Sequence, residues 1–237
     1  MTRKASAAFT LIEMLVVISI IVVLASFAVP AVISGLTKGQ MVGTLNNARQ
    51  LFLAGQQMAL DGATNSDPNF GWPGDLAAAA AAGAPAGGSK IRTLLDYCNR
   101  LAQNDYLKSG DLQKILNAPG TSCSVTGESD GSVTVVGRPS LKVYKVQEVD
   151  ASNTIFAVTN NYTYDTALTN TAAPYGDKGF IVMRKGGDAS TYKKNQATAT
   201  NYGNDPRKFE SAIGKLPTQK DNTAVPGDGD KYLTNPQ

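Results

Sequence analysis

Histidine is absent from this 237-residue chain, and cysteine, tryptophan and charged residues are scarce. Without histidine, catalytic triads that use it, histidine acid–base catalysis and imidazole metal ligands are all excluded. The sequence also contains no P-loop for phosphate binding and no nucleophile elbow around a serine. No catalytic residue is predicted, and we expect a protein that is not an enzyme.

The chain also lacks a strong charge of either sign. The formal net charge is +3, and two of the basic residues, Arg3 and Lys4, lie at the extreme N-terminus. A nucleic-acid-binding surface normally shows a clear excess of clustered basic residues, so no nucleic acid partner is expected. The length suits one globular domain of moderate size with an appendage.

One long apolar run is present, from Phe9 to Ile33, and its only charged residue is Glu13. A helix of about 20 residues spans a bilayer, so this run is long enough. Arg3 and Lys4 precede it and should remain on the cytoplasmic side. A carboxylate in hydrocarbon costs roughly 2.5 kcal/mol or more. Glu13 therefore needs an explanation.

Three interpretations of this segment compete. A cleaved signal peptide, with a small-residue site at Ser26-Phe27-Ala28, and a plain membrane anchor both leave Glu13 unexplained. The third starts from the stretch AFTLIEMLVVISIIVVLA, which resembles the N-terminus of type IV prepilins and type II secretion pseudopilins. This resemblance implies a leader peptide over residues 1–8 and cleavage by prepilin peptidase between Ala8 and Phe9. It also implies N-methylation of Phe9. Ala8 stands where the family usually has glycine.

The resemblance gives Glu13 a role in assembly. Cleavage creates a positively charged amino terminus at Phe9, at the edge of the hydrocarbon. When subunits pack together, the Glu13 carboxylate of one can form a salt bridge with the Phe9 ammonium of another. A buried charge without a partner is strongly unfavourable, whereas a pair is tolerable, so the pairing would favour one axial register.

The resemblance further implies a structural subunit of a type IV pilus or a type II secretion pseudopilus, and the sequence leaves these two open. The subunit would be a single-pass protein of the bacterial inner membrane before assembly and part of a periplasmic or cell-surface filament afterwards. Its implied partners are copies of itself and related pilins, prepilin peptidase, an assembly platform protein and a motor ATPase. The alternative from another class is a monomeric membrane-anchored envelope protein whose head domain binds a ligand.

A single helix is expected over residues 9–61, with residues 9–33 as the transmembrane segment and filament core. After Ile33 the pattern becomes amphipathic, and Gly62 should end the helix. Pro30 lies inside it and predicts a kink or a locally melted turn. One face of the following stretch carries glycines, which could allow bending, permit close helix packing or simply fill the surface: Gly35, Gly39 and Gly43.

The globular head domain is expected over residues 62–237. Residues rich in β-branched and aromatic side chains predict antiparallel strands mainly within 132–185, and residues 188–237 are polar and should form mostly loops. Before the strands, an apolar stripe predicts a helix capped by Ser89. The predicted fold class is α+β and pilin-like, with the long helix packed on an antiparallel sheet.

Two features of the head suggest specific chemistry. Export to an oxidising compartment predicts a disulfide between Cys98 and Cys123, with two buried reduced thiols as the alternative. Asp228 and Asp230 in the Gly-rich stretch PGDGDKY are weak candidates for a calcium site, with a solvated turn as the alternative. No other metal or cofactor is expected.

Overall fold

The computed structural model of the chain describes residues 10–81 and 91–235. These residues belong to two compact units, and the division falls between Gly39 and Gln40. The first unit consists of the N-terminal part of helix α1 (Leu11–Asn65), and the second contains the rest of α1 together with the whole head.

In the first unit, the described part of α1 has apolar side chains on all faces. The large ones from Leu11 to Leu36 are all exposed, by 45 % to 83 % of their surface. The helix is continuous through Pro30. It is long and apolar enough to cross a membrane, with a mean hydropathy of 2.9 over its most apolar window.

In the second unit, α1 has one buried face. Its buried residues recur at spacings of three and four, as expected of an amphipathic helix packed on a core, and they are Met41, Thr44, Ala48, Leu51, Phe52, Ala54, Gly55, Met58, Ala59 and Gly62. The helix continues past Gly62 and ends at Asn65. Gly62 is needed for close packing rather than for termination, because a Cβ there would overlap the carbonyl of Phe70.

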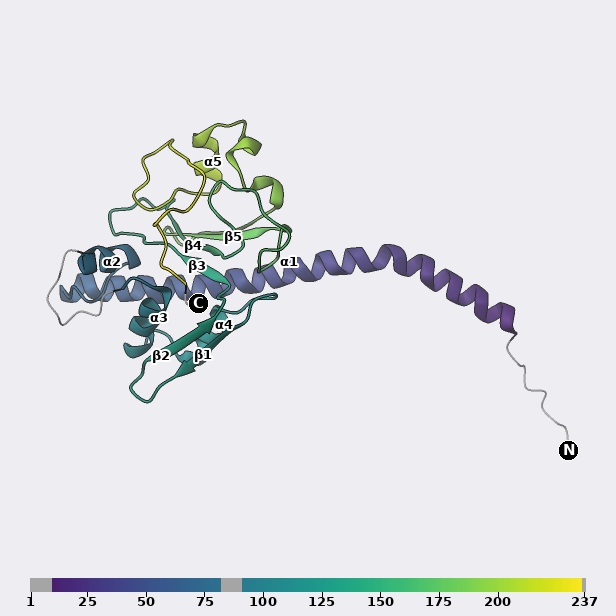
Figure 1. Cartoon of the computed structure of the whole chain (residues 1–237), viewed down its shortest axis with the longest axis horizontal. Coiled ribbons are helices and arrows are strands. Elements are labelled where there is room, and N and C mark those ends of the chain that lie inside the picture. Colours follow the sequence, from purple (N-terminus) through teal and green to yellow (C-terminus); the bar gives the residue numbers. More distant parts are fainter. Residues whose placement is uncertain (1–9, 82–90, 236–237) are drawn as a thin grey trace. The chain divides into compact units, whose positions relative to one another are not determined.

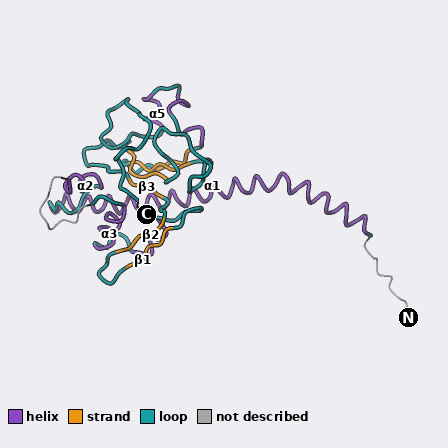
Figure 2. Tube along the Cα trace, in the orientation of Figure 1, coloured by secondary structure: helices purple, strands orange, loops and turns teal. Residues whose placement is uncertain are grey.

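A four-stranded antiparallel sheet packs on this part of α1 (Figures 1 and 2). Its order is β3-β4-β5-β6, a simple meander. The strands are β3 (Leu141–Val143), β4 (Ile155–Thr159), β5 (Phe180–Arg184) and β6 (Ala189–Tyr192). The α+β class and the antiparallel sheet that the sequence predicted are confirmed.

Strands β4 and β5 are buried along their whole length because both faces of the sheet are covered. On one face, the ring of Phe52 in α1 meets Phe156 in β4 edge-on, with ring centroids 5.4 Å apart. On the other, Arg184 of β5 donates from Nε to the carbonyl of Ile213, at the end of helix α5 (Pro206–Ala212), over 3.0 Å. Two short 3-10 helices, η1 (Lys194–Gln196) and η2 (Ala199–Tyr202), precede α5.

A second layer of elements contacts α1 from another side. It comprises the hairpin β1 (Cys123–Gly127) and β2 (Val133–Gly137), with α3 (Leu94–Gln103) and α4 (Ser109–Ile115). Asn47 of α1 donates to the carbonyl of Lys114 in α4 over 2.9 Å. Helix α2 (Pro73–Ala81) follows α1 directly in the chain.

The predicted start of α3 is wrong. Ser89 lies outside the described residues, and the helix begins at Leu94, with Thr93 as its N-cap. The Thr93 hydroxyl accepts from the backbone N–H of Asp96, and the Asp96 carboxylate accepts from the Thr93 N–H. This reciprocal capping satisfies two donors that the helix itself leaves unpaired.

Candidate functional site

The start of α1 is organised around Thr10 and Glu13. The Glu13 carboxylate accepts hydrogen bonds from the Thr10 backbone N–H and from the Thr10 hydroxyl, both at 2.7 Å. The Thr10 hydroxyl in turn accepts from the Glu13 backbone N–H at 3.3 Å. Thr10 precedes the first helical residue and Glu13 is the third residue of the helix, so the two form a capping box.

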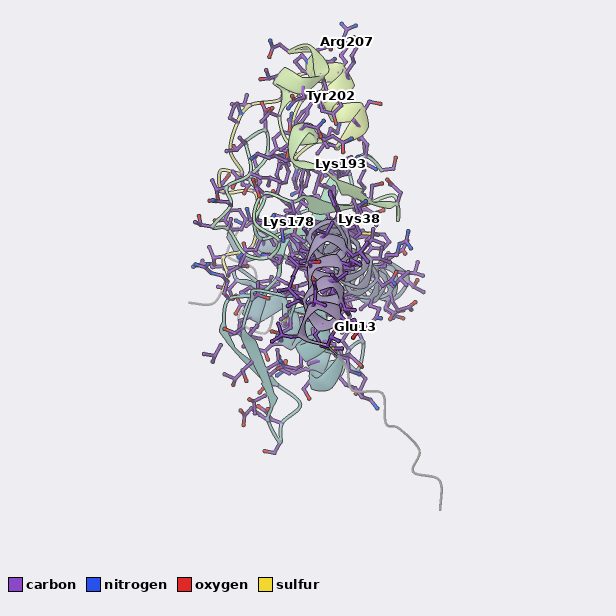
Figure 3. All side chains as sticks on the ribbon, turned by 90° about the vertical axis from the view of Figure 1, so that its right-hand side faces the viewer. Glu13, Lys38, Lys178, Lys193, Tyr202 and Arg207 are labelled. Carbon is purple, nitrogen blue, oxygen red and sulfur yellow. The ribbon has the colours of Figure 1, made fainter. Side chains whose placement is uncertain are left out.

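This capping box gives Glu13 a local structural role that the sequence interpretation missed. Its signal was present, because threonine followed three residues later by glutamate is the capping-box pattern. One oxygen of the carboxylate, Oε2, accepts both hydrogen bonds from Thr10. Glu13 is exposed, and Figure 3 shows it on the N-terminal part of α1. Ala8, Phe9 and the rest of the leader lie outside the described residues, so the salt bridge from Glu13 to Phe9 stays a prediction.

The side chains that follow Glu13 are apolar and exposed over a length that matches a bilayer. In the most apolar window of α1, no residue is buried by the rest of the described chain. The hydroxyls of its two serines are hydrogen-bonded within the helix, because Ser19 and Ser26 each donate to a backbone carbonyl three residues earlier at 2.7 Å. A helix of this kind fits lipid or the company of similar helices, since no polar side chain other than Glu13 needs water there.

Pro30 lies in the middle of this segment, and the kink predicted at Pro30 stays a prediction. Apart from the adjacent residues and the neighbouring backbone of α1 itself, no atom of the described chain lies within 4 Å of where a Cβ would be at Gly35, Gly39 or Gly43. The described part of the molecule therefore supplies no contact that would require glycine at these three positions.

The disulfide predicted between Cys98 and Cys123 is absent from the structure, where both cysteines are free and buried. Burial raises the pKa of the Cys98 thiol to about 12, and the nearby Cys123 adds to this rise. Burial also raises the pKa of Cys123. The thiolate is the reactive form in disulfide chemistry, and both environments disfavour it. The structure corresponds to the alternative of two buried reduced thiols.

The two candidate calcium ligands, Asp228 and Asp230, lie in different environments in the fold. Asp228 is buried and forms an ion pair with Lys142 of β3. Its carboxylate also accepts from the Tyr144 hydroxyl at 2.6 Å and from the Tyr164 backbone N–H at 2.9 Å. Burial raises the pKa of the Tyr144 hydroxyl well above its usual value, and the negative charge of Asp228 adds to the effect. Both oxygens of Asp228 are therefore occupied by protein donors.

Asp230 is exposed, and its backbone carbonyl accepts from the Lys145 ammonium at 2.8 Å. Within residues 10–81 and 91–235, no group of three or more acidic or cysteine side chains could hold a metal ion. The pair of aspartates is thus split between a buried ion pair and an exposed turn. No sequence signal pointed to Lys142 as the partner of Asp228, because 86 residues separate them.

Comparison with known proteins identifies the N-terminal segment. Residues 3–29 match the family model of the prokaryotic N-terminal methylation motif. This motif is characteristic of type IV prepilins and pseudopilins, which confirms the resemblance seen in the sequence. No curated protein and no solved structure matches the chain. The motif and the apolar helix together fit anchoring in a membrane.

Proposed function

We propose, on the premise that residues 3–29 are a prepilin-type methylation motif, that the chain is a structural subunit of a type IV pilus or a type II secretion pseudopilus. In this proposal prepilin peptidase cleaves after Ala8, and Phe9 is methylated. An assembly platform protein and a motor ATPase then move the subunit from the inner membrane into a periplasmic or cell-surface filament.

The observation that carries the proposal is the exposed apolar part of α1, from Leu11 to Leu36, with Glu13 as its one charge. Burial of apolar surface favours lateral packing of such helices when they leave lipid. The head part of α1 also presents exposed apolar residues, since Val42, Leu53 and Leu60 are each exposed by more than half of their surface. These residues give α1 a further apolar contact surface for a neighbouring copy.

Glu13 would select the register of this packing. An isolated carboxylate within packed apolar helices is strongly unfavourable, and an ammonium at Phe9 of a neighbour would neutralise it. The capping box already satisfies Oε2, and Oε1 is not used by that box. The charge of Glu13 therefore remains available to a second chain while its helix start stays ordered.

The first test is the intact mass and N-terminal peptide of the protein from its native membrane or filament fraction. The proposal expects a chain that begins at Phe9 and is heavier by one methyl group. A chain that begins at Val29 would show an ordinary exported protein that has lost its apolar helix. An uncleaved chain would indicate the monomeric anchored protein instead.

The second test separates the charge of Glu13 from its capping role. Glutamine can replace glutamate in a capping box, so Glu13→Gln should keep the helix start and lose only the charge. We expect Glu13→Gln to insert in the membrane normally but to abolish filament assembly. Thr10→Val, which removes the capping hydroxyl and keeps the charge, should still assemble. If Glu13→Gln assembles as well as the wild type, Glu13 acts only as a cap.

A further inference from the structure

Three exposed lysines lie together where α1 leaves the head: Lys178, Lys193 and Lys194, here called the exit lysines. Phe180 of β5 pairs with Tyr192 of β6, so the residues just before β5 and just after β6 lie at the same end of the sheet. This pairing brings the exit lysines together from two segments. Figure 3 shows Lys178 and Lys193 on one side of the head.

Contacts within the head fix this cluster beside the first head residues of α1. The Tyr175 hydroxyl lies 3.0 Å from the carbonyl of Gln40 and 2.6 Å from the Thr44 hydroxyl. A Cβ built on Gly179, the residue after Lys178, would lie 2.9 Å from Met41 Cε. The loop that carries Lys178 is therefore packed against the point where α1 enters the head.

The exit lysines carry an excess of positive charge. Lys194 forms an ion pair with Asp177 at 2.7 Å. In the described part of the chain, Lys178 and Lys193 form no ion pair. One aspartate thus faces three lysines, and two ammonium groups are left to water.

Along α1, the exposed apolar stretch ends a few residues before Met41. Leu36 is the last of the continuous exposed apolar residues, and Lys38 is the first charged residue after Glu13. From Leu36 to Met41 a helix rises by about 8 Å. This rise is about one Debye length at physiological salt, so charges beside Met41 are within range of a charged bilayer surface. Basic residues normally concentrate on the cytoplasmic side of a membrane helix, whereas the proposed topology puts the exit lysines on the opposite side.

We propose that the exit lysines dock the head on anionic phospholipid headgroups while the subunit waits in the membrane before assembly. The inference rests on the proposed function for the membrane insertion of α1. Each lysine near an anionic surface favours the docked state by about fivefold. Docking would hold the head in a defined orientation until extraction of the helix also removes the lysines from the lipid.

The test uses the full chain in nanodiscs that contain one chain each. Because the native thiols are buried, a donor dye placed through Asn195→Cys labels a single exposed position beside the exit lysines. Energy transfer to an acceptor on lipid headgroups then reports the distance of this region from the bilayer. We expect stronger transfer in nanodiscs containing phosphatidylglycerol than in phosphatidylcholine alone, and a loss of this difference at high salt.

A matched pair of triple variants tests the residues. Lys178→Gln, Lys193→Gln and Lys194→Gln together should remove the lipid dependence, with the docking equilibrium constant falling about fivefold for each unpaired lysine lost. The control removes three exposed charges from other parts of the head, at Arg92, Lys108 and Lys220, and should retain it. An equal loss in both variants would show an effect of net charge alone and overturn the proposal.

Three further outcomes are decisive. Transfer that is the same in both lipids, from a chain that co-purifies with the nanodisc, overturns the docking proposal alone. A chain that does not insert overturns docking together with the membrane insertion on which the proposed function depends. If the lipid-dependent transfer is absent with one chain per nanodisc and arises only in nanodiscs loaded with two chains, the lysines contact a second copy, and docking on lipid is overturned.

Discussion

The buried ion pair between Lys142 and Asp228 should be a main determinant of head stability, and Asp228→Asn tests it. The substitution keeps the shape of the side chain and removes its charge. Both residues are almost fully buried, with 7 % and 6 % of their side chains exposed. The Lys142 ammonium would retain its hydrogen bond to the Tyr162 carbonyl at 2.9 Å and its position 5.1 Å from the Tyr232 ring centroid. It would have no counter-charge.

The expected magnitude follows from this burial. Removing one partner of a buried ion pair destabilises a protein by about 3–5 kcal/mol, because the other charge is left uncompensated. Asparagine can still accept from the Tyr144 hydroxyl and the Tyr164 N–H, so no further acceptor is lost. A domain of this size loses about 2–4 °C of melting temperature per kcal/mol. We therefore expect Asp228→Asn to lower the melting temperature by about 10 °C.

The assay is thermal unfolding of the detergent-solubilised full chain, followed by circular dichroism. Asp230→Asn is the matched control, since Asp230 is exposed and only its backbone carbonyl is bonded to Lys145. Its melting temperature should stay within about 2 °C of the wild type. The double variant Lys142→Met with Asp228→Asn removes both charges and should be more stable than Asp228→Asn alone.

Two results would refute this reasoning. A melting temperature for Asp228→Asn equal to that of Asp230→Asn would mean that Lys142 is solvated and that the pair is not buried in solution. A rise in melting temperature on adding calcium, abolished by Asp228→Asn, would restore Asp228 as a metal ligand. The hydrogen bonds around Asp228 predict no response to calcium.

Three smaller predictions concern other parts of the head. Gly55→Ala should destabilise the head by about 1–3 kcal/mol and lower its melting temperature, because the added methyl group would overlap the buried hydroxyl of Tyr97. Gly43→Ala in the same helix should be neutral or stabilising. Equal effects of the two substitutions would contradict this packing. Partial burial and a neighbouring glutamate raise the pKa of Asp75, so stability from its protonated form is lost as pH rises through that pKa. Asp75→Asn should therefore flatten the fall in melting temperature from about pH 4 upward, and an unchanged pH profile would contradict this. Cys98 and Cys123 should react with an alkylating reagent once the protein is unfolded, as read by mass; unfolded protein that reacts only after a reductant is added would instead show a disulfide.

The local patterns of the sequence were sufficient for the N-terminal helix and its motif. An uninterrupted apolar run with one glutamate specifies a helix that needs no head to define it, and its side chains are indeed exposed. The capping box of Thr10 and Glu13 is equally local, because its two residues are three positions apart. Alternating β-branched and aromatic residues were likewise enough to predict the central strands.

Edge elements were harder to predict. Strand β6 lies in the polar segment after residue 188, and strand β1 lies before residue 132, outside the range where strands were expected. An edge strand is held by backbone hydrogen bonds to its neighbour, and these do not require apolar side chains. The composition of such a segment therefore carries little information about its pairing.

The role of Asp228 depends on contacts that form only in the folded head. In the sequence it belongs to a Gly-rich stretch that resembles an exposed turn or a loose calcium loop. In the fold, strand β3 brings Lys142 to it from 86 residues away, and burial makes that pairing necessary. The exit lysines come together for the same reason, because the pairing of β5 with β6 unites two separate segments. Short-range patterns of residues were enough to predict the local elements, whereas contacts between distant residues, and the burial that gives them their energy, depended on how those elements pack.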